Sequence, residues 1–231
     1  LGSSVVSGNV AGLGGGVCLR SQSSAAVSTS TFARNTAANG AGLAVQDAQL
    51  DLSACEVMSN EASESGGGVY GRSATSMDLR NLTVDGNRAA VGGGFFLRES
   101  APVITDVTMR ANRAAVGAGV KLQACTSAAI RRSTFEFNQA GDEQLSATAD
   151  STAPVEGGGI ACDGGTALTL TNTSLRSNEA RSVAGTRGIG GGLAARDCTG
   201  SLHAVTFESN QANQAGGVLW RGSAVLTLDD G

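Results

Sequence analysis

The sequence predicts an all-β fold, namely a right-handed parallel β-helix, or solenoid, of about eight coils with two inserted loops. Three observations predict it: a recurring asparagine, a recurring glycine tripeptide, and apolar residues at fixed distances from both. The asparagine recurs at steps of 26, 25, 27, 25, 26, 40 and 32 residues. Near-constant steps are typical of a solenoid, in which each repeat forms one coil. The eight positions are Asn9, Asn35, Asn60, Asn87, Asn112, Asn138, Asn178 and Asn210.

The second mark of each repeat is the last glycine of a small tripeptide. In six of the eight repeats it follows the asparagine by seven or eight residues. In the other two, extra residues of loop composition lie at about 139–156 and 180–188, which predicts surface loops inserted into an unbroken stack. The eight glycines are Gly16, Gly42, Gly68, Gly94, Gly119, Gly159, Gly192 and Gly217.

Residues 1–231 are interpreted as one β-helix segment. The first residues are already in phase with the repeat, and Leu226 and Leu228 begin a ninth coil. Terminal coils of solenoids need polar caps. We therefore expect this segment to be an excerpt of a longer protein, with further coils on one or both sides.

Apolar columns predict which side chains point inward. The residue three positions before the asparagine and the residue eight before it are apolar in every repeat. The first residue after the glycine is also apolar, and alternation with period two predicts a short strand there. Coils of 25 to 26 residues leave room for three short strands and three turns. Residues of one column are expected to stack about 4.8 Å apart, and the usual sense of parallel crossovers predicts the right hand.

The glycines and asparagines have structural interpretations. Glycine is expected at corners that need a positive φ or close backbone approach. Stacked asparagines can hydrogen-bond nearby backbone and one another along a ladder. The asparagine column is therefore interpreted as structural rather than as a binding site.

The two motifs resemble a known repeat. Phe32–Asn35, Phe135–Asn138 and Phe207–Asn210 read F-x-x-N, and Gly66–Val69 and Gly157–Ile160 are among five segments that read G-G-G followed by an apolar residue. This pattern is similar to the F-x-x-N and G-G-A-[ILV] repeats of polymorphic outer membrane proteins, although glycine stands where that family often has alanine. The resemblance implies a right-handed β-helix exposed at a cell surface, often adhesive.

Composition excludes several function classes. The formal net charge is −4 and Lys121 is the only lysine, so nucleic-acid binding has no electrostatic basis. No apolar run approaches the roughly 18 residues that span a bilayer, so no membrane insertion by this segment is expected. No spacing predicts a metal site or a cofactor site.

The candidate catalytic chemistry is sparse. Asp163 and Asp197 are expected on adjacent coils with Arg196 beside them, which is the closest approach to a catalytic grouping. A polysaccharide lyase or hydrolase needs carboxylates that face one groove. His203 has no Ser or Cys companion at a recognisable spacing. We predict no catalytic residues and no enzyme activity, and a polysaccharide-active β-helix enzyme is the alternative.

Two outward surfaces are candidates for contact with a partner. Tyr70 and Phe96 are expected side by side on adjacent coils near Lys121, as an apolar patch where another chain or an inserted loop packs. An arginine rank four residues past the glycine is either a solvated face or a surface for an acidic glycan or protein. It comprises Arg20, Arg72, Arg98, Arg196 and Arg221.

Five cysteines are too few and too irregular for a disulfide framework. Cys55 and Cys162 are expected to be buried, while Cys125 and Cys198 share a column two coils apart, about 9.6 Å on the strand spacing, which is beyond disulfide reach. Whether any disulfide forms stays open. The sequons at Asn81 and Asn172 share one outward column that would suit N-glycosylation of a secreted protein.

The sequence thus predicts a non-enzymatic structural or adhesive scaffold segment of an extracellular or cell-surface protein or appendage. Its expected partners are other protein subunits or further coils of the same protein, with glycans as a further option. Two alternatives stay open: a fragment of a polysaccharide-active enzyme, and a glycan-binding adhesin.

Overall fold

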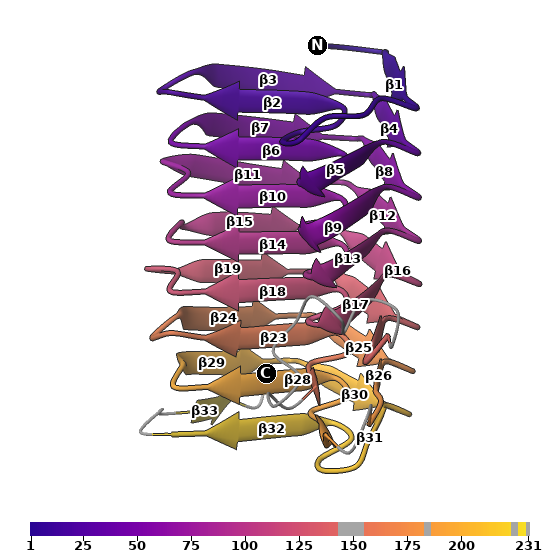
Figure 1. Cartoon of the computed structure of the whole chain (residues 1–231). Coiled ribbons are helices and arrows are strands. Elements are labelled where there is room, and N and C mark those ends of the chain that lie inside the picture. The colour runs from indigo at the N-terminus through magenta and orange to yellow at the C-terminus, as the bar shows by residue number, and fades with distance from the viewer. Residues whose placement is uncertain (143–154, 183–185, 223–225, 230–231) are drawn as a thin grey trace.

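The computed structural model describes residues 1–142, 155–182, 186–222 and 226–229. Within these ranges the chain winds into stacked coils, and each strand pairs in parallel with its equivalents in the coils before and after (Figure 1). The described residues contain strands and turns and no helix. The predicted fold, a right-handed parallel β-helix, is confirmed.

Four sheets run along the stack, each named here by its first strand. The β1 sheet precedes the asparagines and the β2 sheet follows the glycine tripeptides. The β1 sheet contains β1 (Val5–Ser7), β4 (Thr31–Ala33), β8 (Glu56–Met58), β12 (Thr83–Asp85), β16 (Thr108–Arg110), β20 (Thr134–Glu136), β25 (Ser174–Arg176) and β30 (Thr206–Glu208). The β2 sheet contains β2 (Val17–Arg20), β6 (Leu43–Gln46), β10 (Val69–Arg72), β14 (Phe95–Arg98), β18 (Val120–Gln123), β23 (Ile160–Asp163), β28 (Leu193–Arg196) and β32 (Val218–Arg221).

The β3 sheet lies behind the β2 sheet in Figure 1. It contains β3 (Ser24–Ser28), β7 (Gln49–Ser53), β11 (Ser76–Arg80), β15 (Pro102–Thr105), β19 (Ala128–Arg131), β24 (Ala167–Thr171), β29 (Thr199–His203) and β33 (Leu226–Asp229).

A fourth sheet corrects the expectation of three strands per coil. From Asn35 onward, the residues between the asparagine and the glycine tripeptide form one further short strand, because their backbone also pairs with neighbouring coils. This β5 sheet contains β5 (Thr36–Asn39), β9 (Glu61–Ser65), β13 (Arg88–Val91), β17 (Arg113–Val116), β21 (Gln139–Ala140), β26 (Glu179–Ala180) and β31 (Gln211–Ala212). Beside the inserts, β22 (Val155–Glu156) pairs with β27 (Gly188–Ile189).

The apolar columns line the interior as predicted. In the central coils the column before the asparagine is fully buried, and so is the column after the glycine. Val6 and Phe207 of the same columns are only partly buried, because the terminal coils stack on one neighbour each. The buried members are Phe32, Val57, Val84, Met109, Phe135 and Leu175 in the first column and Leu43, Val69, Phe95, Val120, Ile160 and Leu193 in the second.

The eight asparagines form a continuous hydrogen-bonded ladder. Asn87, which is fully buried, is representative: its Nδ2 donates to Asn112 Oδ1 at 3.0 Å and to the Val57 carbonyl at 2.8 Å. Its backbone N–H also donates to Asn112 Oδ1, at 3.0 Å. Each amide therefore satisfies buried groups that the corner would leave unpaired. The ladder also crosses the first insert, since Asn138 Nδ2 donates to Asn178 Oδ1 at 2.9 Å.

The glycine tripeptide combines the two roles predicted for glycine. Its first member has a positive φ, which is 66° at Gly66. Its third member lies against the next coil, since a Cβ on Gly68 would stand 2.7 Å from the carbonyl oxygen of Gly94. A side chain at that position would force the coils apart.

The two insert positions lie largely outside the described residues. Of the segment expected at 139–156, the structure describes 139–142 and 155–156, and of the segment at 180–188 it describes 180–182 and 186–188. The coils resume in register after both, with Ile160 opposite Val120 and Leu193 opposite Ile160.

Candidate functional site

The outer face of the β2 sheet is covered over its second position by the β5 sheet (Figure 1). The glycine turn reverses the chain so tightly that a Cβ on Gly92 would lie 2.8 Å from Cβ of Phe96. As a result, Tyr70 and Phe96 are only 9 % and 8 % exposed, stacked with ring centroids 5.7 Å apart and packed against Val91. The expectation of an open apolar partner patch is corrected, because strands of the same chain cover it.

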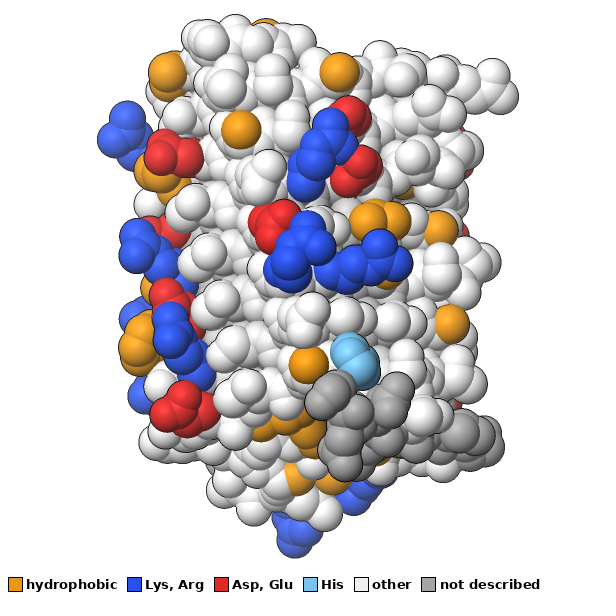
Figure 2. Space-filling model, turned by 180° about the vertical axis from the view of Figure 1, so that it is seen from behind, with side chains coloured by type: hydrophobic (Ala, Val, Ile, Leu, Met, Phe, Trp, Pro, Cys, Tyr) orange, Lys and Arg blue, Asp and Glu red, His pale blue; other side chains and the backbone are white. Residues whose placement is uncertain are grey.

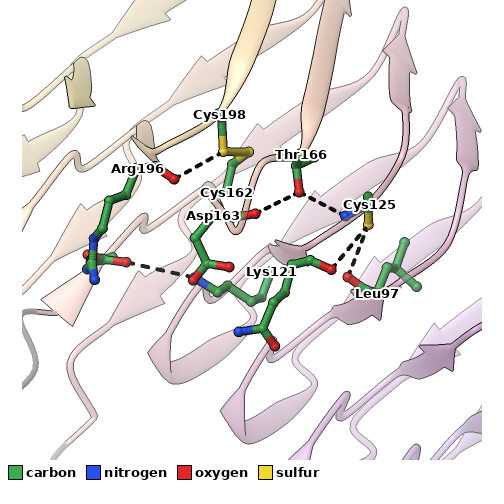
Figure 3. Close-up of a disulfide and its surroundings, with 10 residues drawn as sticks. Leu97, Lys121, Cys125, Cys162, Asp163, Thr166, Arg196 and Cys198 are labelled. Atoms are coloured by element: carbon green, nitrogen blue, oxygen red, sulfur yellow. Dashed lines mark hydrogen bonds and ion pairs between the residues drawn. A yellow bond between two sulfur atoms is a disulfide. The ribbon is translucent and has the colours of Figure 1, made fainter. Parts of the chain in front are cut away.

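Lys121 occupies the next step of this buried column. It lies opposite Phe96 on one side and Ala161 on the other, and it is only 4 % exposed. Its Nζ donates a hydrogen bond to Asp163 Oδ2 at 2.7 Å. The lysine stem thus runs along the sheet face to a carboxylate of the following coil (Figure 3).

Glu156 closes the site from the covering layer. It ends β22, directly before the glycine turn, and is 4 % exposed. Its Oε2 lies 3.8 Å from Lys121 Nζ, and its Oε1 contacts the guanidinium of Arg196. Two carboxylates and two cations therefore alternate across three coils, in the order Asp163, Lys121, Glu156 and Arg196.

Burial dominates the electrostatics of the lysine. Removal from water lowers the pKa of Lys121 below its ordinary value, and the positive charge of Arg196 lowers it further, while Asp163 opposes both effects. Asp163 Oδ1 is buried, and among the described residues it accepts no hydrogen bond. The cluster is neutral in sum but incompletely hydrogen-bonded, which is costly in a low-dielectric site.

Sequence reasoning located Lys121 and Asp163 but missed Glu156. One signal could have found it. In the column that precedes the glycine tripeptide, Glu156 is the only charged residue; the other members are Leu13, Asn39, Ser65, Val91, Val116, Ile189 and Gln214. A charge in an otherwise neutral column, one coil from the only lysine, indicates a specific partner.

The structure does not bring Asp163 and Asp197 together in a groove. Asp163 is turned to Lys121, whereas Asp197 is exposed at a corner, with a φ of 52°. A hollow of about 280 Å³ lies beside the second insert, and its carboxylate, Glu179, is paired with Arg181 at 2.7 Å.

The arginine rank is placed as predicted, along the outer end of the β2 sheet. Arg20, Arg72, Arg196 and Arg221 are exposed. Arg98 is half-buried and donates to Glu99 at 3.0 Å, and Arg196 contacts Glu156. The rank is therefore exposed at four of its five positions, and Arg72, Arg98 and Arg196 lie against carboxylates.

Charges on the opposite face are mixed. Figure 2, which looks at the molecule from behind, shows blue and red side chains in contact on a surface that is mostly neutral. On the β3 sheet, for example, Arg80 pairs with Asp51 at 2.8 Å and also with Asp78. Exposed pairs of this kind contribute little each.

The cysteines include one disulfide, which joins Cys162 to Cys198 across adjacent coils with a Cα–Cα distance of 6.5 Å. Cys55 and Cys162 are buried as predicted. The sequence comparison considered only cysteines of one column and so missed this pair, because Cys198 stands at the corner, three residues beyond the register partner of Cys162. Cys18 is exposed and free, and Cys55 and Cys125 are buried and free.

The two sequon asparagines lie at equivalent exposed corners. Asn81 and Asn172 have φ values of 53° and 49°. Asparagine tolerates this left-handed conformation better than most residues. Both side chains are open to solvent, as glycosylation requires.

Within the described ranges, no group of three or more His, Cys, Asp or Glu side chains is arranged to hold a metal ion. No helix that is long and apolar enough to cross a membrane occurs in the same part of the chain.

Comparison with known proteins supports the architecture. The family model described as "Right handed beta helix region" matches residues 3–184. The chain belongs to this right-handed β-helix family. No curated protein sequence matches it. No solved structure matches it either. β-Helix proteins include structural and polysaccharide-active members, so function has to be argued from the site.

Proposed function

We propose that this β-helix is a non-enzymatic structural and adhesive scaffold segment of a secreted or cell-surface protein, of the polymorphic outer membrane protein type. The observation that carries the proposal is the pairing of Asp163. The best-placed carboxylate for acid–base chemistry is held 2.7 Å from Lys121 Nζ, while Asp197 points to solvent elsewhere. A glycosidase or lyase needs its carboxylates to face the sugar together.

The stack itself supports a scaffold role. Its apolar columns and asparagine ladder run through every coil, so the molecule is a straight rod whose sides present corners and inserts (Figure 1). Partners proposed for such a rod are further coils of the same protein or other subunits, which would continue the parallel pairing.

The disulfide supports a location outside the cytosol. Disulfides such as Cys162–Cys198 persist in oxidising compartments and are rare where thiols are kept reduced. The exposed sequons at Asn81 and Asn172 are compatible with the same location. Labelling intact cells of the source organism with an antibody to this chain tests it: surface labelling is expected, and labelling only after permeabilisation would contradict the proposal.

The catalytic alternative is tested with polysaccharides. The wild-type chain and the Asp197→Ala and Asp163→Ala variants are incubated with acidic and neutral polysaccharides, and new reducing or unsaturated chain ends are measured. We expect none above the background without protein. Depolymerisation by the wild type that either variant abolishes would replace the scaffold proposal with an enzyme.

Glycan binding is a second candidate because four arginines of the rank are exposed. The test compares Arg72→Glu with Arg132→Glu, which changes an equally exposed arginine at the corner between the β3 and β1 sheets. If the rank is the site, binding to an immobilised acidic glycan weakens only in Arg72→Glu and falls as salt rises. Equal weakening in both variants would indicate non-specific attraction and remove this candidate.

A further inference from the structure

Strand β23 carries two successive residues that engage neighbouring coils on opposite sides. Cys162 points inward and is bonded to Cys198 of the following coil. Asp163 points outward, to Lys121 of the preceding coil (Figure 3). One short strand is therefore a junction between β18 of the preceding coil and the corner after β28 of the following coil.

The contact between Lys121 and Asp163 has the geometry of a reacting pair. Lys121 Nζ lies 2.7 Å from Asp163 Oδ2, and Cγ is one bond beyond that oxygen. The lysine side chain is 5 % exposed and the aspartate side chain 21 %. Neighbouring strands of one sheet hold both groups in contact, so their reaction would not require a bimolecular encounter.

A third group stands where proton transfer needs it. Glu156 Oε2 lies 3.8 Å from Lys121 Nζ, and the carboxylate is buried in the strand that covers the site. Its other oxygen contacts the guanidinium of Arg196. An ionised carboxylate beside an ammonium group is a general base.

We propose that Lys121 and Asp163 condense into an intramolecular isopeptide bond, with Glu156 as the proton-transfer group. Glu156 takes a proton from the Lys121 ammonium, and the nitrogen lone pair attacks Cγ of Asp163. The bond between Cγ and one carboxylate oxygen then breaks. That oxygen leaves as water with two of the three ammonium protons, the third stays on the amide nitrogen, and Glu156 is regenerated. The reaction needs no oxidant and no co-reactant.

The surroundings favour the product. Burial lowers the pKa of Lys121, which increases the fraction of neutral, nucleophilic amine. A buried ion pair also carries a desolvation cost that a neutral amide does not. Phe96 on one side and Ala161 on the other keep the position of the lysine apolar and dry.

The bond would link β18 to β23, while the disulfide links β23 to the corner that follows β28. Three consecutive coils would then be joined covalently at the point where the first insert enters the stack. This inference concerns the chain's own chemistry and does not depend on the proposed surface function.

The single lysine makes the test direct, because Lys121 is the only side-chain amine of the chain. The folded wild-type protein is denatured, its disulfide is reduced, and its intact mass is measured. We expect the mass to be one water below the value calculated from the sequence. A protease specific for lysine should leave the chain uncut, and an acylating reagent should modify the N-terminal amine alone.

Three variants supply the controls. Lys121→Arg and Asp163→Ala each lack one reacting group and should keep their full calculated mass. Glu156→Gln keeps both reacting groups but lacks the proton-transfer carboxylate. The bond between Lys121 and Asp163 should therefore form at least about 100-fold more slowly than in the wild type. Freshly folded Glu156→Gln should therefore be cut by the lysine-specific protease at one site. Cooperative thermal unfolding of each variant shows that it has folded.

The wild-type result decides the proposal by itself. A wild-type protein that folds, keeps its full mass after prolonged incubation and is cut after Lys121 would overturn it, whatever the variants do. Amide formation in Glu156→Gln at the wild-type rate would overturn the role of Glu156.

Discussion

The coils up to Asn138 and the coils after it are stabilised by different sets of interactions. In the first region the steps are nearly constant, and stability comes from repetition: buried apolar columns and one buried amide per coil. The second region keeps both features across its inserts but adds a disulfide and a buried charge cluster. Among the described residues, the first region contains no disulfide, and it supplies only Lys121 to the charge cluster.

The comparison shows which features tolerate insertion. Residues of one column meet their equivalents in the next coil however long the intervening loop is, so the ladder bond from Asn138 to Asn178 is as short as those between regular coils. What changes is the residue that re-enters the stack. After the first insert the returning strand carries Glu156, which places a buried carboxylate beside Lys121 in an otherwise neutral column.

The largest expected effect is a charge in the regular interior. Val84→Asp buries an unpaired carboxylate between Val57 and Met109. It should destabilise the protein by more than about 4 kcal/mol. Arg98→Ala is the control, since its half-exposed ion pair contributes little. Thermal unfolding measures both, and equal melting temperatures would contradict the assignment of the columns.

The next effect concerns the asparagine ladder. Asn112→Ala leaves the Asn87 amide groups without their acceptor and the Val84 carbonyl without its side-chain donor. The expected loss is about 3 kcal/mol, because each buried group left unsatisfied costs roughly 1–3 kcal/mol. Asn9→Ala removes an exposed side chain at the end of the ladder, whose amide donates to Asn35 but accepts from no other asparagine. It should cost far less in urea unfolding, and equal losses would show that burial does not set the cost.

An intermediate effect tests the second region. The Cys162→Ala, Cys198→Ala double variant should lose about 2–4 kcal/mol, since the disulfide restricts the unfolded chain. Cys55→Ala, at a free buried cysteine, is the matched control for loss of the sulfur alone. The two unfolding midpoints in urea are compared. A midpoint in the double variant no lower than in Cys55→Ala would show that the inserted coils do not depend on the cross-link.

The smallest effect is electrostatic. Arg132 donates two hydrogen bonds of 2.8 Å to Asp106 and lowers the pKa of that carboxyl. A lowered folded-state pKa contributes stability above the ordinary value of 3.8, and this is lost as pH falls through the folded value. The wild type should therefore melt slightly above Arg132→Gln at neutral pH and equal to it in strong acid. A difference that grows on acidification would contradict this sign.

The repeat by itself determined the parallel β-helix, its interior columns, the outward arginine rank and the asparagine ladder. It could do so because each property belongs to a column that occurs eight times, and repetition separates it from chance. The fourth strand of each coil escaped prediction because its residues vary and its pairing is set by the neighbouring coils. The partner patch at Tyr70 and Phe96 was wrong for the same reason: alternation showed that both point outward, but not that the β5 sheet covers them.

Contacts that occur once were decided only by the tertiary structure. The pairing of Cys162 with Cys198 joins two different columns, and the meeting of Lys121, Asp163 and Glu156 joins three. Such contacts depend on how far each side chain reaches across the coil and on how the chain re-enters after an insert. The columns of the repeat show which residues stack along the rod. These contacts join residues of different columns, so only the folded structure shows which side chains meet.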